Sequence, residues 1–307
     1  MSSSAKIVVV GSTNVDMVVQ AQRIPRPGET VLGGEFTLTD GGKGANQAVA
    51  AARLGADVTF IARVGNDAFG ERALRQFAGE GIRTEHLIRD PEAAHGVALI
   101  LVDAGGENAI AVAPGANARL SPDDVQRAEA AVAACDLVLL QLEVPLPAVE
   151  RAISLAKKHG KRVVLNPAPY TALPDSMLSQ VDLLTPNETE AEMLLGGGEA
   201  GLSGVAGTAE ELIRRGVGTV ILTLGKEGVF VVTPDEQFHV AGRKVEVVDT
   251  TAAGDAFSGA LAVAVAEGQP FRQAVRFAIA ASALSVTRLG AQASLPTRDE
   301  VEALLHS

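Results

Sequence analysis

Aromatic residues are scarce in this chain of 307 residues, which contains no Trp, one Tyr and nine Phe. Proteins that stack bases on aromatic platforms need such side chains, so the composition is poor for that class. Because hydrophobic residues still make up 47 %, the core must be built from Ala, Val, Leu and Ile. Together with 21 % charged residues, this composition is typical of a globular protein with one large or two small domains.

A basic excess is also missing, since the net charge is −11. A general nucleic-acid binder needs a basic surface to neutralise phosphates, so we expect no nucleic-acid partner. A nucleotide substrate is not excluded, because a local site can be positive within an acidic protein. No apolar run is long enough for a membrane span or a signal peptide, and the strand-like Ile7–Val10 follows the amino terminus directly. We therefore expect a cytoplasmic enzyme without a membrane partner.

Cysteine and histidine offer little reactive chemistry. The single cysteine, Cys135, has no partner for an intramolecular disulfide, and the apolar run that follows it predicts a buried, unreactive thiol. The five histidines are scattered without metal-ligand spacing, and we interpret them as structural or surface residues: His86, His95, His159, His239 and His306.

Strand-length apolar runs alternate with Ala-rich helical stretches along most of the chain. The expected strands are Lys6–Gly11, Asp57–Val64, Leu137–Leu142, Arg162–Asn166, Val181–Thr185 and Thr219–Leu224, followed by a short meander over Gly228–Val232 and Gln237–Val240. The expected helices are Ala45–Leu54, Gly70–Glu80, Pro122–Ala134, Pro147–His159, Glu188–Leu195 and Thr208–Arg215, with a closing helical region from Gly254 onward. This alternation predicts an α/β fold whose central, mostly parallel sheet is flanked by helices on both faces.

Two segments, about 15–40 and 96–117, break this rhythm with Gly, Pro and β-branched residues. The first predicts strands at Val15–Gln20 and Thr30–Thr39, and the second predicts strands at Val97–Val102 and Asn108–Ala113. The turn Asp103–Gly106 suits a β-hairpin. We expect both insertions to form a small β-lid on a single α/β domain that spans residues 1–307. One side of this lid would be exposed and apolar, with Val18, Leu32, Phe36, Leu99 and Ile110 among its candidates.

The familiar nucleotide-binding motifs are absent. No P-loop motif occurs, and Gly196–Gly201 matches Gly-x-Gly-x-x-Gly only after a predicted helix, so we interpret it as a loop. The segment Asp249–Asp255 is more informative, because an expected strand at Lys244–Val248 ends there and an expected helix at Ala256–Ala266 begins just after it. Ala252, Ala253 and Gly254 are small enough to let backbone amides approach a phosphate at a helix N-terminus.

Asp255, beside that anion hole, could accept a hydroxyl proton during phosphoryl transfer. The structural alternative is an aspartate that only stabilises the first turn of a helix.

Several motifs in the expected order resemble the ribokinase-like family of carbohydrate kinases. Asp249–Asp255 is similar to the carboxy-terminal signature of that family, and Gly41–Ala48 is similar to its amino-terminal signature, in the form found in members that phosphorylate D-ribose. Further similarities cover essentially the whole chain: Gly11–Asp16, Pro27–Thr30, Asn166–Pro169, Thr185–Glu190 and Leu222–Gly225.

The resemblance implies roles for individual residues. The sugar-binding positions would be Asn14, Asp16, Gly42, Lys43, Asn46, Glu143 and Asp255. Lys43 is unusual as a structural residue because a cation in the first turn of a helix opposes the helix dipole. Glu143, after an expected strand, could instead be a solvated carboxylate.

The resemblance also implies an ATP site and a cation site. The ATP positions would be Asn187, Glu190, Thr223, Gly225, Gly228 and Gly254, with Mg²⁺ accompanying the nucleotide. Asn187 and Glu190 taken alone form a helix capping box, and both interpretations can hold together. The loop Thr223–Gly228 taken alone is a tight β-turn. An activating K⁺ would lie at Asp249, Thr251, Ser285, Arg288, Gly290 and Ser294.

These roles predict transfer of phosphate from ATP to O5 of D-ribose, with Asp255 as general base, by an enzyme that dimerises through its lid. The rival kinases are fructokinase, 2-keto-3-deoxygluconate kinase, adenosine kinase and a sugar-phosphate kinase. Scarce aromatics disfavour adenosine, and the absence of extra cations disfavours a sugar phosphate. A non-catalytic sugar or nucleotide sensor is the alternative from another class. Ile279 stands where a polar residue can lie near the adenine in this family, so base recognition stays open.

Overall fold

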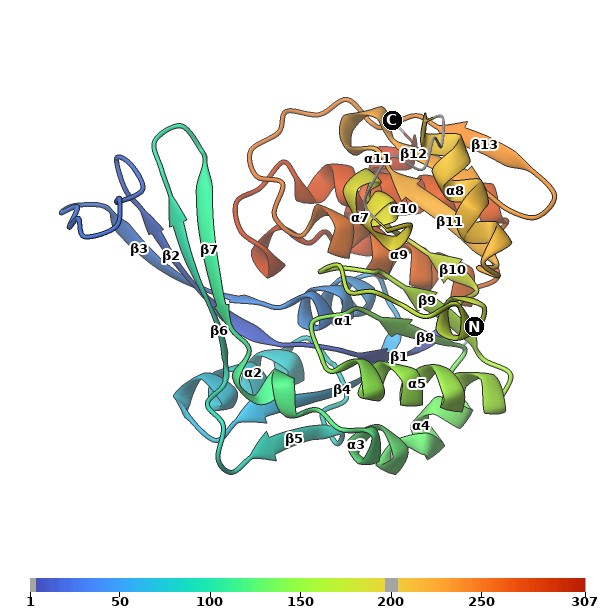
Figure 1. Ribbon diagram of the computed structural model, residues 1–307, viewed down its shortest axis with the longest axis horizontal. Coiled ribbons are helices and arrows are strands. Elements are labelled where there is room, and N and C mark those ends of the chain that lie inside the picture. The colour runs from blue at the N-terminus through green and yellow to red at the C-terminus, as the bar shows by residue number, and fades with distance from the viewer. Residues whose placement is uncertain (1–3, 197–203, 307) are drawn as a thin grey trace.

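Residues 4–196 and 204–306 are described here from a computed structural model, in which a nine-stranded sheet forms the body and a four-stranded sheet projects from it (Figure 1). The strand order in the body is β13-β12-β11-β10-β9-β8-β1-β4-β5. All pairings from β11 to β5 are parallel, and β12 and β13 are antiparallel additions. The body strands are β1 Lys6–Val10, β4 Asp57–Gly65, β5 Leu87–Asp90, β8 Leu137–Leu140, β9 Arg162–Leu165, β10 Leu183–Leu184, β11 Thr219–Thr223, β12 Val229–Val232 and β13 Gln237–Val240.

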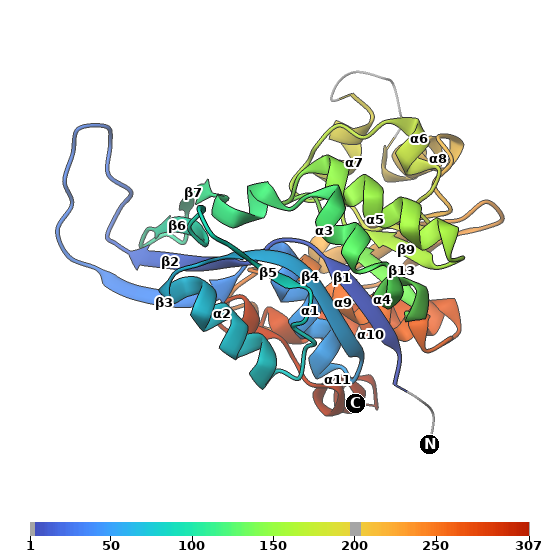
Figure 2. The same ribbon diagram turned by 90° about the horizontal axis from the view of Figure 1, so that it is seen from below.

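Helices cover both faces of this sheet (Figure 2). One face carries α1 Lys43–Arg53, α2 Ala68–Gly79, α9 Ala253–Ala266, α10 Phe271–Ser285 and α11 Arg298–His306. The opposite face carries α3 Pro122–Arg127, α4 Glu129–Ala134, α5 Leu146–Lys158, α6 Asp175–Leu178, α7 Glu188–Leu194 and α8 Gly204–Arg214. Alternate residues of β1, such as Val8 and Val9, enter opposite cores, which is why the strands are apolar without interruption. The predicted fold class is confirmed.

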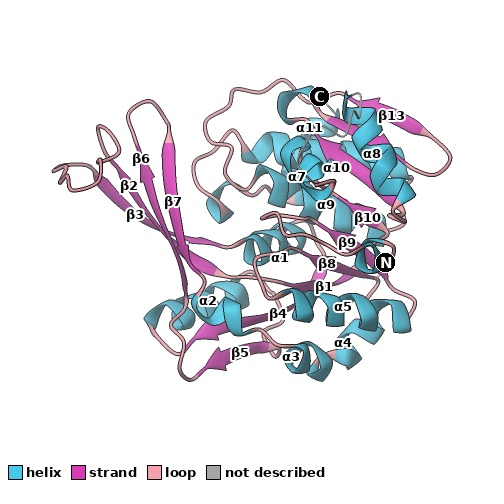
Figure 3. Ribbon diagram, in the orientation of Figure 1, coloured by secondary structure: helices cyan, strands magenta, loops and turns pink. Residues whose placement is uncertain are grey.

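The small sheet contains both predicted insertions in the order β3-β2-β6-β7. Its strands are β2 Asn14–Gln20, β3 Glu35–Gly41, β6 Gly96–Val102 and β7 Asn108–Ala113. Each hairpin is antiparallel, and β2 joins β6 in parallel, so the sheet stands away from the body as one unit (Figure 3). The carboxylate of Asp103 accepts the N–H groups of Gly105 and Glu107, which shapes the predicted turn.

Both faces of this lid are apolar. Leu32, Phe36, Leu99 and Ile110 are exposed as expected, whereas Val18 is half-buried. The sequence-based expectation placed these residues on one exposed side. The register instead puts Val18 and Ile110 on the same face as Asp16, and Phe36 and Leu99 on the reverse, because facing partners in paired strands share a face.

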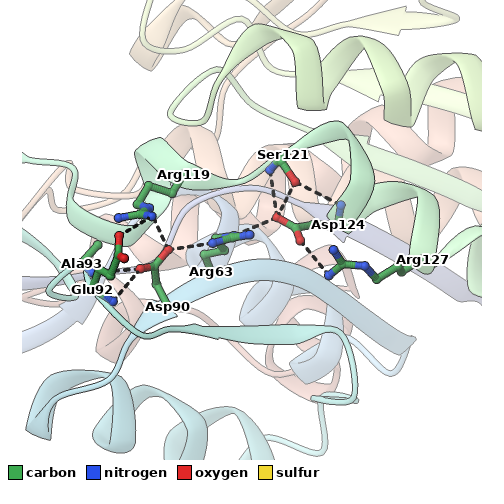
Figure 4. Close-up of polar contacts among 8 residues, drawn as sticks. All are labelled: Arg63, Asp90, Glu92, Ala93, Arg119, Ser121, Asp124 and Arg127. Carbon is green, nitrogen blue, oxygen red and sulfur yellow. Dashed lines mark hydrogen bonds and ion pairs between the residues drawn. The ribbon is translucent and has the colours of Figure 1, made fainter.

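The stem of the β6–β7 hairpin is fastened to the body by ion pairs (Figure 4). Arg63 of β4 donates to the carboxylates of both Asp90 and Asp124 at 2.7 Å, and both carboxylates are inaccessible to solvent. Asp90 also accepts Arg119, which follows β7, and two backbone N–H groups in the turn that leads to β6. Burial opposes ionisation of Asp90 and Asp124, but these donors outweigh it and lower the pKa of each carboxyl.

Two predicted strands were wrong. The expected strand Lys244–Val248 is irregular chain: β13 ends the sheet before it, and Val247 and Val248 are exposed without a neighbouring strand. The expected strand Thr30–Thr39 begins only at Glu35, because Gly33 and Gly34 have φ of 98° and 121°.

Some helix boundaries also differ from expectation. The predicted helix Pro122–Ala134 is divided at Ala128, and α9 begins at Ala253, three residues earlier than expected. The loop predicted at Gly196–Gly201 lies, except for Gly196, outside the described residues.

Candidate active site

Asp255 lies in the first turn of α9, buried beside α1. Two consecutive side chains of α1 hold its carboxylate: Asn46 Nδ2 donates to Oδ2 at 2.9 Å, and Gln47 Nε2 donates to Oδ1 at 2.9 Å. Because each oxygen has its own amide donor, the plane of the carboxylate is fixed. Asn46 Oδ1 is buried without a partner among the described residues, so it can accept a hydroxyl hydrogen from a ligand.

A chain of buried amides continues from Gln47 along the carboxyl ends of the strands. Gln47 accepts from Gln141 Nε2 at 2.6 Å and donates to Asn166 Oδ1 at 3.1 Å, and Asn166 donates to the carbonyl of Thr185 at 3.0 Å. Gln141, Asn166 and Thr185 each follow directly after β8, β9 or β10. Gln47 lies within the signature segment Gly41–Ala48, but its bond to Asp255 was not predicted, and no motif marks Gln141.

The N-terminus of α9 lies where the sequence predicts an anion hole. Ala252 has φ 61°, and no other non-glycine residue within the described chain has positive φ. This left-handed geometry is sterically costly for alanine. The N–H of Ala253 donates to the Thr250 carbonyl at 3.2 Å, while no acceptor within the described chain bonds the N–H groups of Ala252, Gly254 or Asp255. These three N–H groups can bind an anion.

A cavity of about 200 Å³ opens in front of this helix end. The predicted ATP residues Asn187, Glu190, Thr223 and Gly254 line it, together with Lys43, Asn166, Ala168, Thr185, Thr250, Ala252, Ala253 and Asp255. Asn187 and Glu190 also form the complete capping box of α7, so their structural role is real and does not remove them from the cavity.

The two remaining ATP positions, Gly225 and Gly228, lie just beyond the cavity lining. They flank the single turn η2 (Gly225–Glu227), with φ of 54° and 96°. The expected tight turn after β11 is therefore present.

The predicted sugar residues gather on the lid side of Asp255, where β2 and β3 join the body. Glu143 Oε2 accepts from Ser12 Oγ at 2.5 Å and from the Lys43 backbone N–H at 2.9 Å. Asn14 and Asp16 stand two residues apart on β2 and therefore face the same way. Gly42 is the N-cap of α1, which carries Lys43 and Asn46 in its first turn.

Charge in this region is dominated by carboxylates. Burial, with the charges of Glu143, Asp40 and Asp255, raises the pKa of Asp16 to about 7. Burial alone would lower the pKa of Lys43, but the charges of Asp255, Glu143 and Glu190 outweigh it and raise that pKa. The Lys43 ammonium makes no ion pair within 4 Å in the described part of the chain, so it remains available to an anionic ligand.

Part of the predicted cation set meets beside the same helix end. Asp249 accepts the backbone N–H and the hydroxyl of Thr251 with one oxygen, and the Gly290 N–H with the other. Ser285 and Ser294 donate their hydroxyl hydrogens to carbonyls of their own turns. The Arg288 guanidinium pairs with Glu300. Asp249 has no cationic side chain within 4 Å among the described residues, which fits a carboxylate that serves a monovalent cation.

Other candidates lie away from this chemistry. Cys135 is buried as predicted, and burial raises the pKa of its thiol to about 11. Ile279 is buried in the core on α10. A cavity of about 270 Å³ lies at the opposite edge of the sheet beside Lys6, Asp57 and Cys135, where the strands begin. Within residues 4–196 and 204–306, no three His, Cys, Asp or Glu residues are grouped to hold a metal, and no helix is long and apolar enough to cross a membrane.

This arrangement is typical of a phosphotransferase site: a buried carboxylate lies between a pocket with free backbone N–H groups and a cluster of polar side chains. The sequence matches the family described as pfkB family carbohydrate kinase over residues 4–298. The chain belongs to this family, and the predicted resemblance is confirmed.

Individual relatives are similar along their whole length. A ribokinase from Haemophilus influenzae is 46 % identical over 302 residues, which cover 98 % of this chain and 99 % of the relative. The crystal structure of the ribokinase from Thermotoga maritima has a TM-score of 0.90 and 39 % identity, covering 99 % of this chain and 100 % of the other. The structure of Arabidopsis thaliana ribokinase complexed with ribose and ATP has a TM-score of 0.89 and 32 % identity, with the same coverage.

The raised pKa of Asp16 predicts a pH-dependent cost of folding. The pKa of the Asp16 carboxyl rises from 3.8 to about 7 on folding, so the folded state holds this proton more tightly than the unfolded state. The contribution of Asp16 to the free energy of unfolding is therefore fully present below pH 4 and is lost as pH rises through 7. Relative to Asp16→Asn, the wild type should therefore lose about 2–3 kcal/mol of unfolding free energy between pH 5 and pH 8. Urea denaturation of both proteins without sugar measures this difference. If the unfolding free energies of the two proteins change with pH in parallel, ionisation of Asp16 in the folded state has little effect on stability.

Proposed function

We propose that this protein transfers the γ-phosphoryl group of ATP to the 5-hydroxyl of D-ribose, giving D-ribose 5-phosphate and ADP. The ribokinases similar to it over their full length support the substrate pair. The observation that carries the proposal is the position of Asp255, which borders the cavity on one side and bonds Asn46 of the sugar cluster on the other.

The chemistry follows from these positions. Asp255 accepts the proton of the 5-hydroxyl while the sugar oxygen bonds to the γ-phosphorus and the bond to the β–γ bridging oxygen breaks. The N–H groups of Ala252, Gly254 and Asp255 and the Lys43 ammonium stabilise the negative charge on the phosphoryl oxygens. Asn14, Asp16, Asn46 and Glu143 hold the neutral sugar hydroxyls, each of which needs a partner when buried.

Mg²⁺ enters with ATP in this proposal. Glu190 is the carboxylate in the cavity that fits it, since Mg²⁺ is usually bound through one or two carboxylates, water and substrate phosphates. When bound, it neutralises phosphate charge. Gly225 and Gly228 lie under the nucleotide phosphates, and Asn187 and Thr223 line the same side.

The alternatives receive less support. Lys43 is the one cation among the predicted sugar positions, so a second phosphate on the sugar would lack counter-charges. A non-catalytic sensor has no need of a fixed carboxylate beside free N–H groups. Fructose and 2-keto-3-deoxygluconate remain the closest competitors, because both also present neutral hydroxyls.

A substrate panel tests the proposal. Wild-type protein with ATP and Mg²⁺ should release ADP fastest with D-ribose, measured by a coupled assay against 2-deoxyribose, fructose, fructose 6-phosphate, 2-keto-3-deoxygluconate and adenosine. If kcat/KM for another compound exceeds that for ribose, that compound is the substrate. If no compound in the panel stimulates ADP release, the proposed kinase activity is wrong.

Asp255→Asn should keep the fold and ribose binding but lose most turnover. The amide is nearly isosteric, and removal of a general base typically costs about 10²- to 10⁴-fold in kcat. Circular dichroism and a ribose-induced rise in Tm serve as controls for folding and binding. If the variant retains more than about a tenth of wild-type kcat, Asp255 is not the base.

K⁺ should activate the enzyme. It would be held beside the α9 N-terminus by Asp249, Thr251 and backbone carbonyls at Ser285, Arg288, Gly290 and Ser294. We expect higher kcat in KCl than in NaCl at equal ionic strength, and a smaller difference in Asp249→Asn. Equal wild-type rates in the two salts would remove the cation from the proposal.

The chain acts, in this proposal, as one cytoplasmic kinase domain with its lid at about 15–40 and 96–117. Two copies would pair through their lids, because a four-stranded sheet with two apolar faces leaves Phe36 and Leu99 on one side and Ile110 on the other in water. One lid could then complete the sugar site of its neighbour.

Sedimentation tests this dimer at micromolar concentration. Ile110→Asp places a charge on one face of the lid, and Leu99→Asp places a charge on the other. The variant whose charge lies on the face that forms the interface should sediment as a monomer near 31.5 kDa and have reduced activity. A wild type that sediments as a fully active monomer would contradict the dimer.

A further inference from the structure

Asn117 is a buried polar residue to which the sequence analysis assigned no role. It lies in the short 3₁₀ helix η1 (Gly115–Arg119), directly after the lid strand β7, and only 2 % of it is exposed. Its side chain reaches across to the start of β2. Oδ1 accepts the Thr13 N–H at 2.9 Å, and Nδ2 donates to the Thr13 carbonyl at 3.0 Å and to Asn14 Oδ1 at 2.7 Å.

The backbone of Thr13 decides the orientation of both amides. A backbone N–H can only donate and a backbone carbonyl can only accept, so the oxygen of Asn117 must face the Thr13 N–H and its NH₂ must face the carbonyl. The atom of Asn14 that faces this NH₂ must then be the acceptor, Oδ1. The NH₂ group of Asn14 is left without a partner in the described chain, so the unpaired group that Asn14 offers to a ligand is a hydrogen-bond donor.

We propose that Asn117 is a positioning residue for sugar recognition, which fixes Asn14 as a hydrogen-bond donor toward the sugar. This role rests on the proposed function, in which Asn14 contacts the substrate. Asp16 follows two residues later on the same face of β2 and offers acceptor oxygens. Such a pair can bind two neighbouring hydroxyls: the donor bonds the oxygen of one hydroxyl, and the acceptor bonds the hydrogen of the other.

The surroundings leave this pair little freedom. Gly96, the first residue of lid strand β6, lies so close that a Cβ atom there would be 2.2 Å from Asn14 Oδ1 and 2.3 Å from Asn117 Nδ2. On the other side, Arg119 of the same short helix is tied to Asp90, which Arg63 connects to Asp124 (Figure 4). The lid stem therefore holds Asn117, and Asn117 holds Asn14.

A double-mutant cycle on ribose KM tests this role in the intact enzyme. Asn117→Ala should raise the KM for ribose about tenfold, the value of one buried hydrogen bond, while kcat and the KM for ATP stay within about twofold. In the Asn14→Ala background the same substitution should change the ribose KM less than about twofold, because Asn14 is no longer there to be oriented.

Ile153→Val is the matched control for lost stability. It removes one buried methyl group from α5 at a cost of about 1 kcal/mol, without touching Asn117, Thr13 or Asn14. It should lower Tm and leave the ribose KM unchanged. A tenfold effect of Asn117→Ala in both backgrounds, or an equal effect of Ile153→Val, would overturn the positioning role.

Asn14→Asp tests whether Asn14 acts as a hydrogen-bond donor toward the sugar, and it leaves Asn117 unchanged. This variant can therefore replace Asn117→Ala if that variant does not fold. Its carboxylate still accepts from Asn117 but presents an acceptor to the sugar, so the ribose KM should rise at least tenfold; an unchanged KM would overturn the donor role. If the wild type does not phosphorylate ribose, the proposed function is refuted and the positioning role is still testable. The double-mutant cycle is then measured with the sugar that the substrate panel identifies. An effect of Asn14→Ala without one of Asn117→Ala refutes only the positioning role.

Discussion

The contact between α1 and α9 is the constraint on which the active site depends. Asn46 and Gln47 can hold Asp255 only because the two helices approach very closely. A Cβ atom on Gly259 would lie 2.7 Å from Ala50 Cβ and 3.0 Å from the Gln47 carbonyl. Small residues in both helices therefore bring a donor pair and a carboxylate within 2.9 Å. The alanines of α1 and α9 therefore have a functional consequence beyond filling the core.

Periodicity predicted the body of the fold because its causes are local. Continuous apolar runs such as Ile7–Val10 indicate that a strand is buried on both faces of the sheet, and the alternation of strands and helices indicates a parallel sheet. The capping box at Asn187 and Glu190 is likewise visible in four residues. The prediction of a strand at Lys244–Val248 failed for a non-local reason: its alternating pattern suits a strand, but none of the strands in the described part of the chain lies beside it.

The predicted site residues came from motifs, and they share one edge of the sheet. What the sequence could not provide is the set of side chains that orient them. Ser12 and Gln47 lie within the motif segments Gly11–Asp16 and Gly41–Ala48, whereas Gln141 and Asn117 lie outside every motif. The side chain of each bonds a residue 94 or more positions away, apart from the Ser12 bond to Gly44. Such partners are defined by the folded chain and have no spacing to recognise.

The lid has no linker between itself and the predicted sugar residues. Asn14, one of these residues, is the first residue of β2, and β3 ends at Gly41, one residue before the N-cap of α1. Because β2 is one continuous strand that carries Asn14 and Asp16 at its body end and pairs with β3 and β6 along its length, a tilt of the lid sheet moves both residues with it. In the proposed function, the position of the lid and the binding of the sugar are therefore coupled.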